Sequence, residues 1–365
     1  MQKKLALIAI MQIEKSAAGA ARVAHHQIRY LKKNGFEVHV FADRANKAAV
    51  EKSGAQLHRA WLWKGTGYLR RKIFAWQASK LKSRLKPDLT IGHGDITQQD
   101  LLFLHNCVHL AHEMIENKPL PASHEMHKAH TPMLTSHSGL IVANSNLMKL
   151  DIINRFQKSE QQVQVIYPAF NEAKFFISTD HKKANIRTEL GIPQNKFLIG
   201  LVTSGNFKKR GLDFFVLVLE KMKPELLEKI HVVFVGKDHF STPAHLPIQQ
   251  LPVTEEVEKY YRMLDLFVLP ARIEEFGLVA SEAMACGAPV LLSPHVGAAE
   301  LWDNPCEITC PLDVDLWAQR ITKLMSDPEH LKKLSLQGPV FAKKAGEEAI
   351  SLAYEKLFTK TYHST

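Results

Sequence analysis

Residues 264–287 read LDLFVLPARIEEFGLVASEAMACG, and this stretch decides the fold. A continuous apolar segment ends at Pro270, a short polar turn follows, and a segment of helical composition begins near Gly277. Continuous apolar strands that alternate with helices are typical of parallel sheets covered on both faces. In such sheets the loop after a strand lies at the carboxyl edge, where ligands bind. The stretch therefore predicts a ligand-binding loop in an α/β protein.

Similar apolar segments recur along the chain and form two series that alternate with segments of helical period. The first series comprises residues 5–11, 37–42, 89–92, 101–104 and 140–143, and the second comprises residues 197–202, 231–236, 264–270 and 289–292. A chain of 365 residues is also too long for one compact core of ordinary size. We therefore expect two doubly wound domains, residues 1–168 and 169–346, with the amphipathic segment 347–365 packing back on the first.

Two carboxylates flank the decisive loop, because Glu274 lies in the polar turn and Glu282 in the helical segment after it. A carboxylate accepts hydrogen bonds from two hydroxyls, which suits a ribose diol or the vicinal hydroxyls of a hexose. Gly277 lets the backbone approach a diphosphate, and the start of a helix favours an anion. Taken singly, either glutamate also fits a solvated loop or an exposed helix face. Together they predict a nucleotide-sugar site.

The segment resembles the E-x7-E signature of the retaining GT-B glycosyltransferases of family 4, also called glycosyl transferases group 1. The matching positions are Asp265, Phe267, Pro270, Glu274, Phe276, Gly277, Leu278, residues 282–287, Pro289 and Val290, whereas Ala271 and Glu275 replace the usual Ser and Gly. The resemblance implies a GT-B architecture, in which two doubly wound, Rossmann-like domains face a central cleft. The second domain would bind the donor and the first the acceptor.

The resemblance also implies individual roles. Glu282 would hold the ribose hydroxyls and Glu274 would lie beside the transferred sugar. The amides of Phe276, Gly277, Leu278 and Val279 would face the sugar and phosphates.

Another loop, the basic VTSGNFKKRG at residues 202–211, follows a predicted strand of the second series. The family places a basic residue here against the donor diphosphate, and fixed cations stabilise the charge that gathers on this leaving group. We expect Lys209 and Arg210 to do so, with Gly205 contributing to donor binding and Lys208 facing solvent. The order Lys-Arg departs from the family pattern, and a solvated turn is the alternative interpretation.

Two further resemblances lie in the N-terminal half. Residues 16–23, SAAGAARV, resemble the family's G-G-x-x-R loop, in which Gly19 matches the second Gly and Ala18 replaces the first. The resemblance implies that Gly19 contributes to donor binding. His105 follows an apolar strand and resembles the family's strand-end histidine near the transferred sugar, although a structural hydrogen-bond donor is the alternative. Residues 90–109 are similar in layout to bacterial lipopolysaccharide-core glucosyltransferases.

The formal net charge of +10 at pH 7 favours anionic partners. Residues 68–86 predict a basic amphipathic helix that docks on an anionic membrane, with an ordinary surface helix as the alternative. Nucleic acid is not expected, because the paired glutamates would repel a phosphate chain. The cysteines and the histidines at 109–130 lack metal-ligand spacing, so we expect no metal and no cofactor beyond the nucleotide-sugar co-substrate.

The resemblance implies a retaining hexosyltransferase that uses a nucleotide sugar, with a UDP-sugar favoured. A glycan or glycolipid, such as lipopolysaccharide core, would be the acceptor. The departing phosphate would take the acceptor proton on the front face, without a metal. The cysteine usage suggests a cytoplasmic location, which leaves room for peripheral attachment to the inner face of the membrane. A GT-B sugar-nucleotide epimerase and a non-enzymatic nucleotide-sugar-binding protein are the alternatives.

Overall fold

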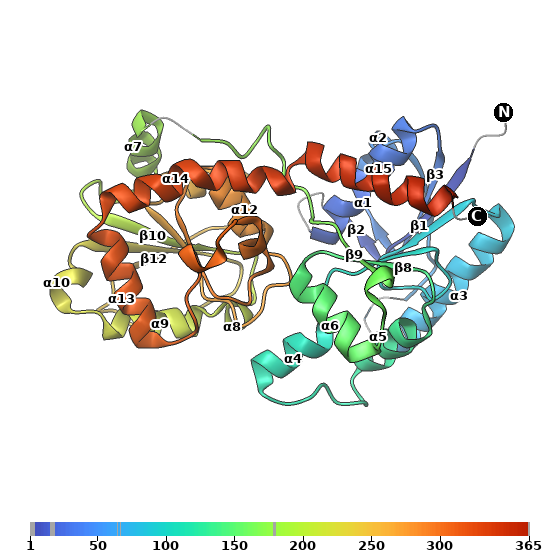
Figure 1. Ribbon diagram of the computed structural model, residues 1–365, viewed down its shortest axis with the longest axis horizontal. Helices are drawn as coiled ribbons and strands as arrows, with labels where there is room; N and C mark the ends of the chain where they lie inside the picture. The colour runs from blue at the N-terminus through green and yellow to red at the C-terminus, as the bar shows by residue number, and fades with distance from the viewer. Residues whose placement is uncertain (1–3, 15–18, 64, 66, 178–179, 364–365) are drawn as a thin grey trace. The chain divides into compact units, whose positions relative to one another are not determined.

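The computed structural model describes residues 4–14, 19–63, 65, 67–177 and 180–363 (Figure 1). It consists of two compact units, Met1–Ala169 with Ser351–Thr365, and Phe170–Ile350. We call them the first unit and the second unit. Each is built on its own parallel sheet with helices on both faces, which confirms the predicted α/β fold class.

The first unit contains a seven-stranded sheet in the order β5-β3-β1-β6-β7-β8-β9. Its strands are β1 (Leu5–Ala9), β3 (Glu37–Ala42), β5 (Ala55–Arg59), β6 (Leu89–Gly92), β7 (Leu101–Phe103), β8 (Leu140–Ala143) and β9 (Val163–Val165). Its helices are α1 (Gly19–Lys33), α2 (Lys47–Lys52), α3 (Tyr68–Leu85), α4 (Val108–Glu116), α5 (Glu125–Ser136) and α6 (Asn146–Phe156). The short strands β2 (Gln12–Ile13) and β4 (Arg44–Ala45) pair separately. Figure 1 shows α1 and α2 over one face of the large sheet and α3 and α5 over the other.

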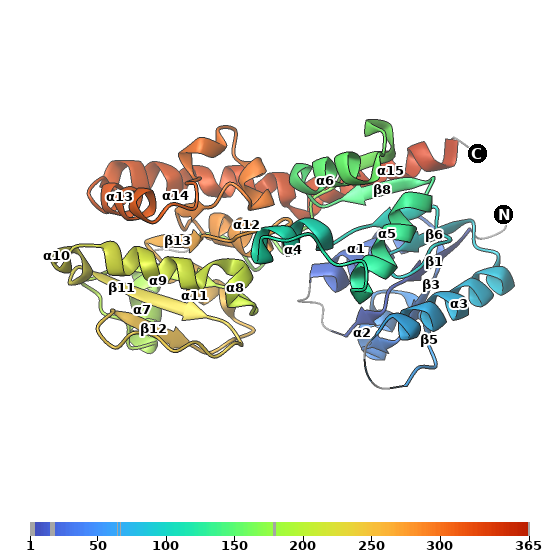
Figure 2. The same ribbon diagram turned by 90° about the horizontal axis from the view of Figure 1, so that it is seen from below.

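The second unit contains a five-stranded sheet in the order β12-β11-β10-β13-β14. The strands are β10 (Phe197–Val202), β11 (Ile230–Val235), β12 (Ile248–Leu251), β13 (Leu266–Leu269) and β14 (Val290–Leu292). The helices are α7 (Asp180–Glu189), α8 (Phe207–Arg210), α9 (Leu212–Lys221), α10 (Pro224–Leu227), α11 (Val257–Met263), α12 (Leu278–Ala285), α13 (Val314–Met325) and α14 (Pro328–Ala342). Figure 2 shows α13 and α14 lying side by side.

Every apolar segment predicted as a strand forms one, with only the ends shifted. Within the two large sheets, the strands outside the two predicted series are β5, β9 and β12, and each lies at an edge of its sheet. An edge strand pairs on one side only, so its sequence need not be continuously apolar. β12 reads IQQL, in which only Leu251 is fully buried. The polar centre of such a strand hides it from an analysis based on apolar segments.

The C-terminal helix α15 (Glu347–His363) carries the end of the chain onto the first unit. The ring of Tyr354 lies 5.3 Å from that of His26 and 6.0 Å from that of Phe103. The rings of Tyr30 and Phe358 stack at 5.4 Å. Because Tyr354 is 2% exposed, this helix completes the core on the α1 side of the sheet.

Both large sheets reverse their strand order at one place, between β1 and β6 in the first unit and between β10 and β13 in the second. In open α/β sheets, ligands bind in the crevice outside the carboxyl ends of the strands at such a switch point. The loops after these four strands are therefore the places to look for a functional site. None of the described helices combines the length and apolar composition that crossing a bilayer requires.

Candidate functional site

The loop after β13 in the second unit is held against the loop after β14. The backbone N–H of Glu274 donates to the carbonyl of His295 at 2.9 Å, and the N–H of Gly297 donates back to the carbonyl of Glu274 at 3.0 Å. Gly277 caps α12 with φ of +94°, and a Cβ there would lie 3.0 Å from Cγ of Glu274. The E-E-F-G sequence therefore turns sharply into α12, because glycine alone adopts this backbone without strain.

The loop after β10 approaches the end of β13 equally closely. Gly211 has φ of +73°, and a Cβ at this position would lie 1.8 Å from the carbonyl oxygen of Pro270. The single turn of α8 begins at Asn206, whose side chain accepts from the N–H of Lys209 at 3.1 Å. The N–H of Arg272 donates to the carbonyl of Lys209 at 2.9 Å. These contacts place Lys209 and Arg210 at the switch point of the sheet.

Two buried ion pairs join these loops. Nζ of Lys209 lies 2.5 Å from Oε2 of Glu275, and Nε of Arg210 lies 2.6 Å from Oε2 of Glu274. The four side chains are between 5% and 17% exposed. The structure thus brings three predicted site residues together and adds Glu275, which the sequence analysis noted only as a departure from the family pattern. The sequence signal for this pairing was the pair of adjacent acidic residues, Glu274 and Glu275, in one loop and the pair of adjacent basic residues in the other.

The electrostatics around Glu274 depend on this arrangement. Burial raises the pKa of Glu274, Arg210 and Lys209 oppose the rise, and Glu275 adds to it. Nε of Arg210 and Oε2 of Glu274 form a short, direct ion pair, and this contact favours the charged form of the carboxyl. The buried Glu274 carboxyl is therefore held beside two cations that favour its charged form.

The other predicted donor residues of the second unit lie around this centre. Glu282 is 4% exposed on α12 and accepts from the hydroxyl of Tyr261 at 3.1 Å. Phe276 is buried, and the half-buried Leu278 and Val279 form the first turn of α12, whose N–H groups lack helical partners. Gly205 has φ of +140° and faces Asp238, whose Oδ1 would lie 3.1 Å from a Cβ there. Their roles toward a donor remain predictions.

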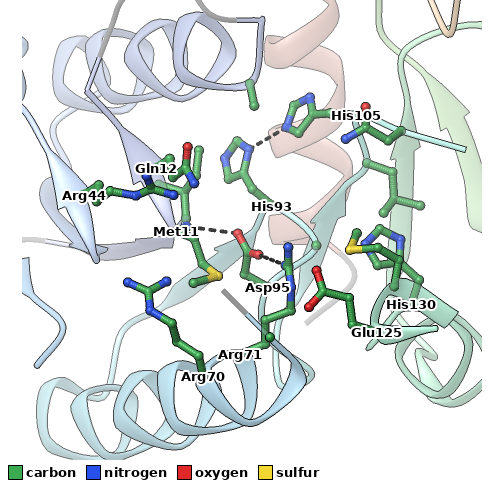
Figure 3. Close-up of a pocket in the computed structure, with 17 residues that line it drawn as sticks. Met11, Gln12, Arg44, Arg70, Arg71, His93, Asp95, His105, Glu125 and His130 are labelled. Atoms are coloured by element: carbon green, nitrogen blue, oxygen red, sulfur yellow. Dashed lines mark hydrogen bonds and ion pairs between the residues drawn. The ribbon is translucent and has the colours of Figure 1, made fainter. Parts of the chain in front are cut away.

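A pocket of about 230 Å³ opens at the switch point of the first unit (Figure 3). Loops after β1, β6 and β7 form its floor, and α3 and α5 contribute side chains from the sides. Its lining includes Met11, Gln12, Arg44, Arg70, Arg71, His93, Asp95, His105, Glu125 and His130. The predicted His105 therefore lines a concave site, which a purely structural hydrogen-bond donor would not need to do.

His105 belongs to a hydrogen-bonded pair that Figure 3 shows with a dashed line. Its Nε2 lies 2.7 Å from Nδ1 of His93, and Nε2 of His93 lies 3.0 Å from Oε1 of Gln27. Burial lowers the pKa of His105 to about 4 and that of His93 well below its usual value. Both rings are therefore neutral at pH 7. With the Gln27 amide so oriented, His93 donates to Gln27 and accepts from His105, which leaves Nδ1 of His105 as an acceptor.

Two arginines of α3 form the opposite side of the pocket. Arg70 is 5% exposed, is ion-paired with Asp43, and donates from Nε to the carbonyl of Trp63 at 2.9 Å. Nη1 of Arg71 lies 3.0 Å from Oδ1 of Asp95. Burial raises the pKa of Asp95, while the N–H of Met11 and Arg71 oppose the rise. Cationic side chains facing neutral imidazoles suit a ligand rich in hydroxyls or carrying an anionic group.

Two family models match the chain: Glycosyltransferase Family 4 over residues 17–174 and Glycosyl transferases group 1 over residues 182–340. The chain belongs to the group 1 glycosyl transferases. The second match contains both ion pairs, and the first contains His93, His105 and the pocket's arginines. The E-x7-E segment thus lies in the group 1 region, as the sequence resemblance implied.

Curated relatives carry related names. An uncharacterized glycosyltransferase of Methanocaldococcus jannaschii is 28% identical over 46% of this chain and 45% of its own length. A D-inositol 3-phosphate glycosyltransferase of Salinispora arenicola is 26% identical over 51% of this chain and 47% of its own. The chain thus spans about half the length of these relatives.

Solved structures support the GT-B architecture. WaaG, a glycosyltransferase involved in lipopolysaccharide biosynthesis, matches with a TM-score of 0.77 at 15% identity, over 95% of this chain and 99% of its own. HepE of Anabaena, in complex with UDP and glucose, matches with a TM-score of 0.75 at 16% identity, over 98% and 100%. At these identities the matches establish the fold of this chain and not its ligands.

The remaining sequence expectations concern Gly19 and metals. Gly19 begins α1 and is exposed, with no atom within 4 Å of an ideal Cβ, while Ala18 and the rest of that predicted loop lie outside the described residues. Within the described ranges no group of three His, Cys, Asp or Glu side chains is positioned to hold a metal ion. His109, for example, pairs instead with Thr131, at 2.9 Å.

Proposed function

We propose that the chain is a retaining glycosyltransferase that moves a hexose from a nucleotide sugar to a glycan or glycolipid acceptor. The observation that carries this proposal is the facing pair of ion pairs, Lys209–Glu275 and Arg210–Glu274, at the switch point of the second unit. The match to the group 1 family model and the burial of these four side chains support it.

The second unit would bind the donor, which we propose to be a UDP-sugar. Glu282 would accept from the ribose hydroxyls, and Glu274 would accept from the transferred sugar. Gly205 and the amides at Phe276, Gly277, Leu278 and Val279 would approach the diphosphate. The fold match to HepE of Anabaena, which was solved with UDP-glucose, favours this choice of nucleotide.

The chemical step would depend on Lys209 and Arg210. As the glycosidic bond to the sugar breaks, negative charge develops on the diphosphate, and cations held in place before the reaction stabilise it. The departing phosphate oxygen would take the proton of the acceptor hydroxyl as that hydroxyl attacks from the same face. Configuration at the sugar carbon would then be retained. The proposal assigns the charge stabilisation to these side chains and includes no metal.

The first unit would bind the acceptor. Its pocket combines Arg44, Arg70 and Arg71 with the neutral His105, a lining that suits a hydroxylated, partly anionic glycan such as a lipopolysaccharide core. Gly19, at the start of α1, would contribute to donor binding. An anionic membrane surface would be a further partner through residues 68–86, on the cytoplasmic side.

A thermal-shift screen with UDP-, GDP- and ADP-sugars tests the donor proposal, because a ligand that binds only the folded state raises its stability. We expect a UDP-sugar to raise the melting temperature most and Glu282→Ala to reduce that rise. The exposed Glu225→Ala is a matched control that should leave the rise unchanged. No shift with any sugar nucleotide, or conversion of the donor to its epimer without an acceptor, would overturn the proposal.

A further inference from the structure

Three of the five tryptophans of the chain lie on one segment and are exposed to solvent. Trp61 is 90% exposed, Trp63 48% and Trp76 56%, and the neighbouring Leu69 is 64% exposed. The other two, Trp302 and Trp317, are buried. Large apolar side chains gathered on a surface mark interaction sites more often than single exposed ones do. We call Trp61, Trp63, Leu69 and Trp76 the tryptophan face.

The backbone holds the tryptophan face in place. Ala60 and Leu62 pack against the core cluster around Phe74. Trp61 and Trp63 alternate with them along the chain and are directed to the outside. Gln77 accepts from the N–H of Trp61 at 2.9 Å and donates to its carbonyl at 2.8 Å. The carbonyl of Trp63 accepts from the buried Arg70. These contacts tie the segment before α3 to the helix and support the outward position of its indoles.

Helix α3 does not have the single apolar face that the sequence suggested. Phe74, Ala78 and Leu81 are buried, whereas Leu69 and Trp76 lie outside. The exposed residues at positions 69, 72, 76, 80 and 83 follow helical spacing and form one stripe. In this stripe Nζ of Lys80 lies 3.9 Å from the ring centroid of Trp76. Apolar and cationic groups therefore alternate along the outer side of α3.

The charge of this region has one sign. From Lys52 to Pro87, both included, the sequence contains ten Lys or Arg residues and no Asp or Glu. Clustered cations attract an anionic leaflet, and tryptophan prefers the boundary between headgroups and acyl chains. A surface that combines exposed indoles with the exposed Lys72 and Lys80 therefore matches both layers of a membrane interface.

We infer that the tryptophan face, with Lys72 and Lys80, docks this protein on the surface of an anionic lipid bilayer. The opposite side of α3 carries Arg70 and Arg71, which line the pocket of the first unit (Figure 3). One helix thus lies between the lipid surface and the pocket. This arrangement suits an acceptor anchored in the same bilayer, a point that rests on the proposed function, whereas docking itself does not.

Vesicle flotation tests the inference, with phosphatidylcholine vesicles that contain or lack phosphatidylglycerol and without any sugar nucleotide. We expect the protein to float with the anionic vesicles and to be released by salt. Lys72→Gln with Lys80→Gln should weaken this binding by roughly 30-fold, since each cation near an anionic surface contributes about a factor of five. Trp61→Ser with Trp76→Ser should weaken binding and reduce the blue shift of tryptophan emission on adding vesicles, because only Trp63 of the three exposed tryptophans remains.

Matched controls lie on the second unit. Leu336 is 60% exposed and Lys332 is exposed on the same helix α14, so Leu336→Ser with Lys332→Gln should bind vesicles as the unaltered protein does. Urea unfolding checks that every variant is folded. Failure of the unaltered protein to bind anionic vesicles, or equal binding by the face variants and the control, would overturn the inference. Stronger binding to DNA or to a second copy of the chain through the same residues would also overturn it. A donor-induced thermal shift that persists then shows that the proposed function stands separately.

Discussion

The switch points of the two units differ in the charge of the side chains around them. In the second unit, Lys209 and Arg210 are each in contact with a buried carboxylate, so the proposed donor diphosphate would share these cations with Glu275 and Glu274. In the first unit the pocket is open and is lined by imidazoles that burial keeps neutral. The comparison suggests that the second unit is built to stabilise changing charge and the first to orient hydroxyl groups.

The largest effect is expected at the cations of the second unit. Arg210→Ala or Lys209→Ala should lower turnover by about 100- to 1,000-fold, the usual loss when one fixed donor to developing charge is removed. Initial rates with a saturating sugar nucleotide measure this effect. Lys208→Ala is the control, because Lys208 is exposed on the same turn of α8. If all three variants kept normal rates, the catalytic assignment to this loop would be wrong.

The next effect concerns stability in the same unit. Glu275→Ala leaves the charge of Lys209 buried without its carboxylate, so the free energy of unfolding should fall by about 3 kcal/mol. Replacing both partners, with Lys209→Met and Glu275→Leu, should recover most of this loss because no buried charge remains. Urea unfolding curves measure both changes. A single variant as stable as the unaltered chain would show that the pair is not buried in solution.

Acid should destabilise the first unit more than the second. Burial lowers the pKa of His26, His105, His109 and His130 in the first unit to about 4. Between about pH 6.5 and pH 4 the unfolded chain therefore binds more protons than the folded chain, and stability falls as the pH falls. Each such histidine should cost about 1 kcal/mol per pH unit. Hydrogen exchange followed by mass spectrometry should show the first unit losing protection before the second, and the reverse order would contradict this assignment.

The smallest effect is expected at the histidine pair of the first unit. Gln27→Leu removes the acceptor for the Nε2 proton of His93, which frees His93 to change tautomer and to stop accepting from His105. Turnover should fall about tenfold, in line with the loss of one hydrogen bond. Gln27→Glu restores an acceptor, so its rate should recover near neutral pH. Equal losses in both variants would indicate a packing role for Gln27 instead.

The sequence by itself determined the strands that are buried in the middle of a sheet, because such strands must be continuously apolar. It also determined the decisive loop and its family, since Gly277 and the residues around Glu274 and Glu282 match a specific pattern. The search for apolar segments missed the edge strands β5 and β12, because an edge strand meets solvent on one side.

Only the tertiary structure decided which charges meet. Lys209 and Glu275 are 66 residues apart, and no local rule joins them until Gly211 lets one loop lie against the carbonyl of Pro270. The tertiary structure likewise paired His105 with His93 and divided the apolar residues of α3 between the core and the surface. Local sequence specifies which elements form, whereas contacts between loops of neighbouring strands depend on how the whole sheet is packed.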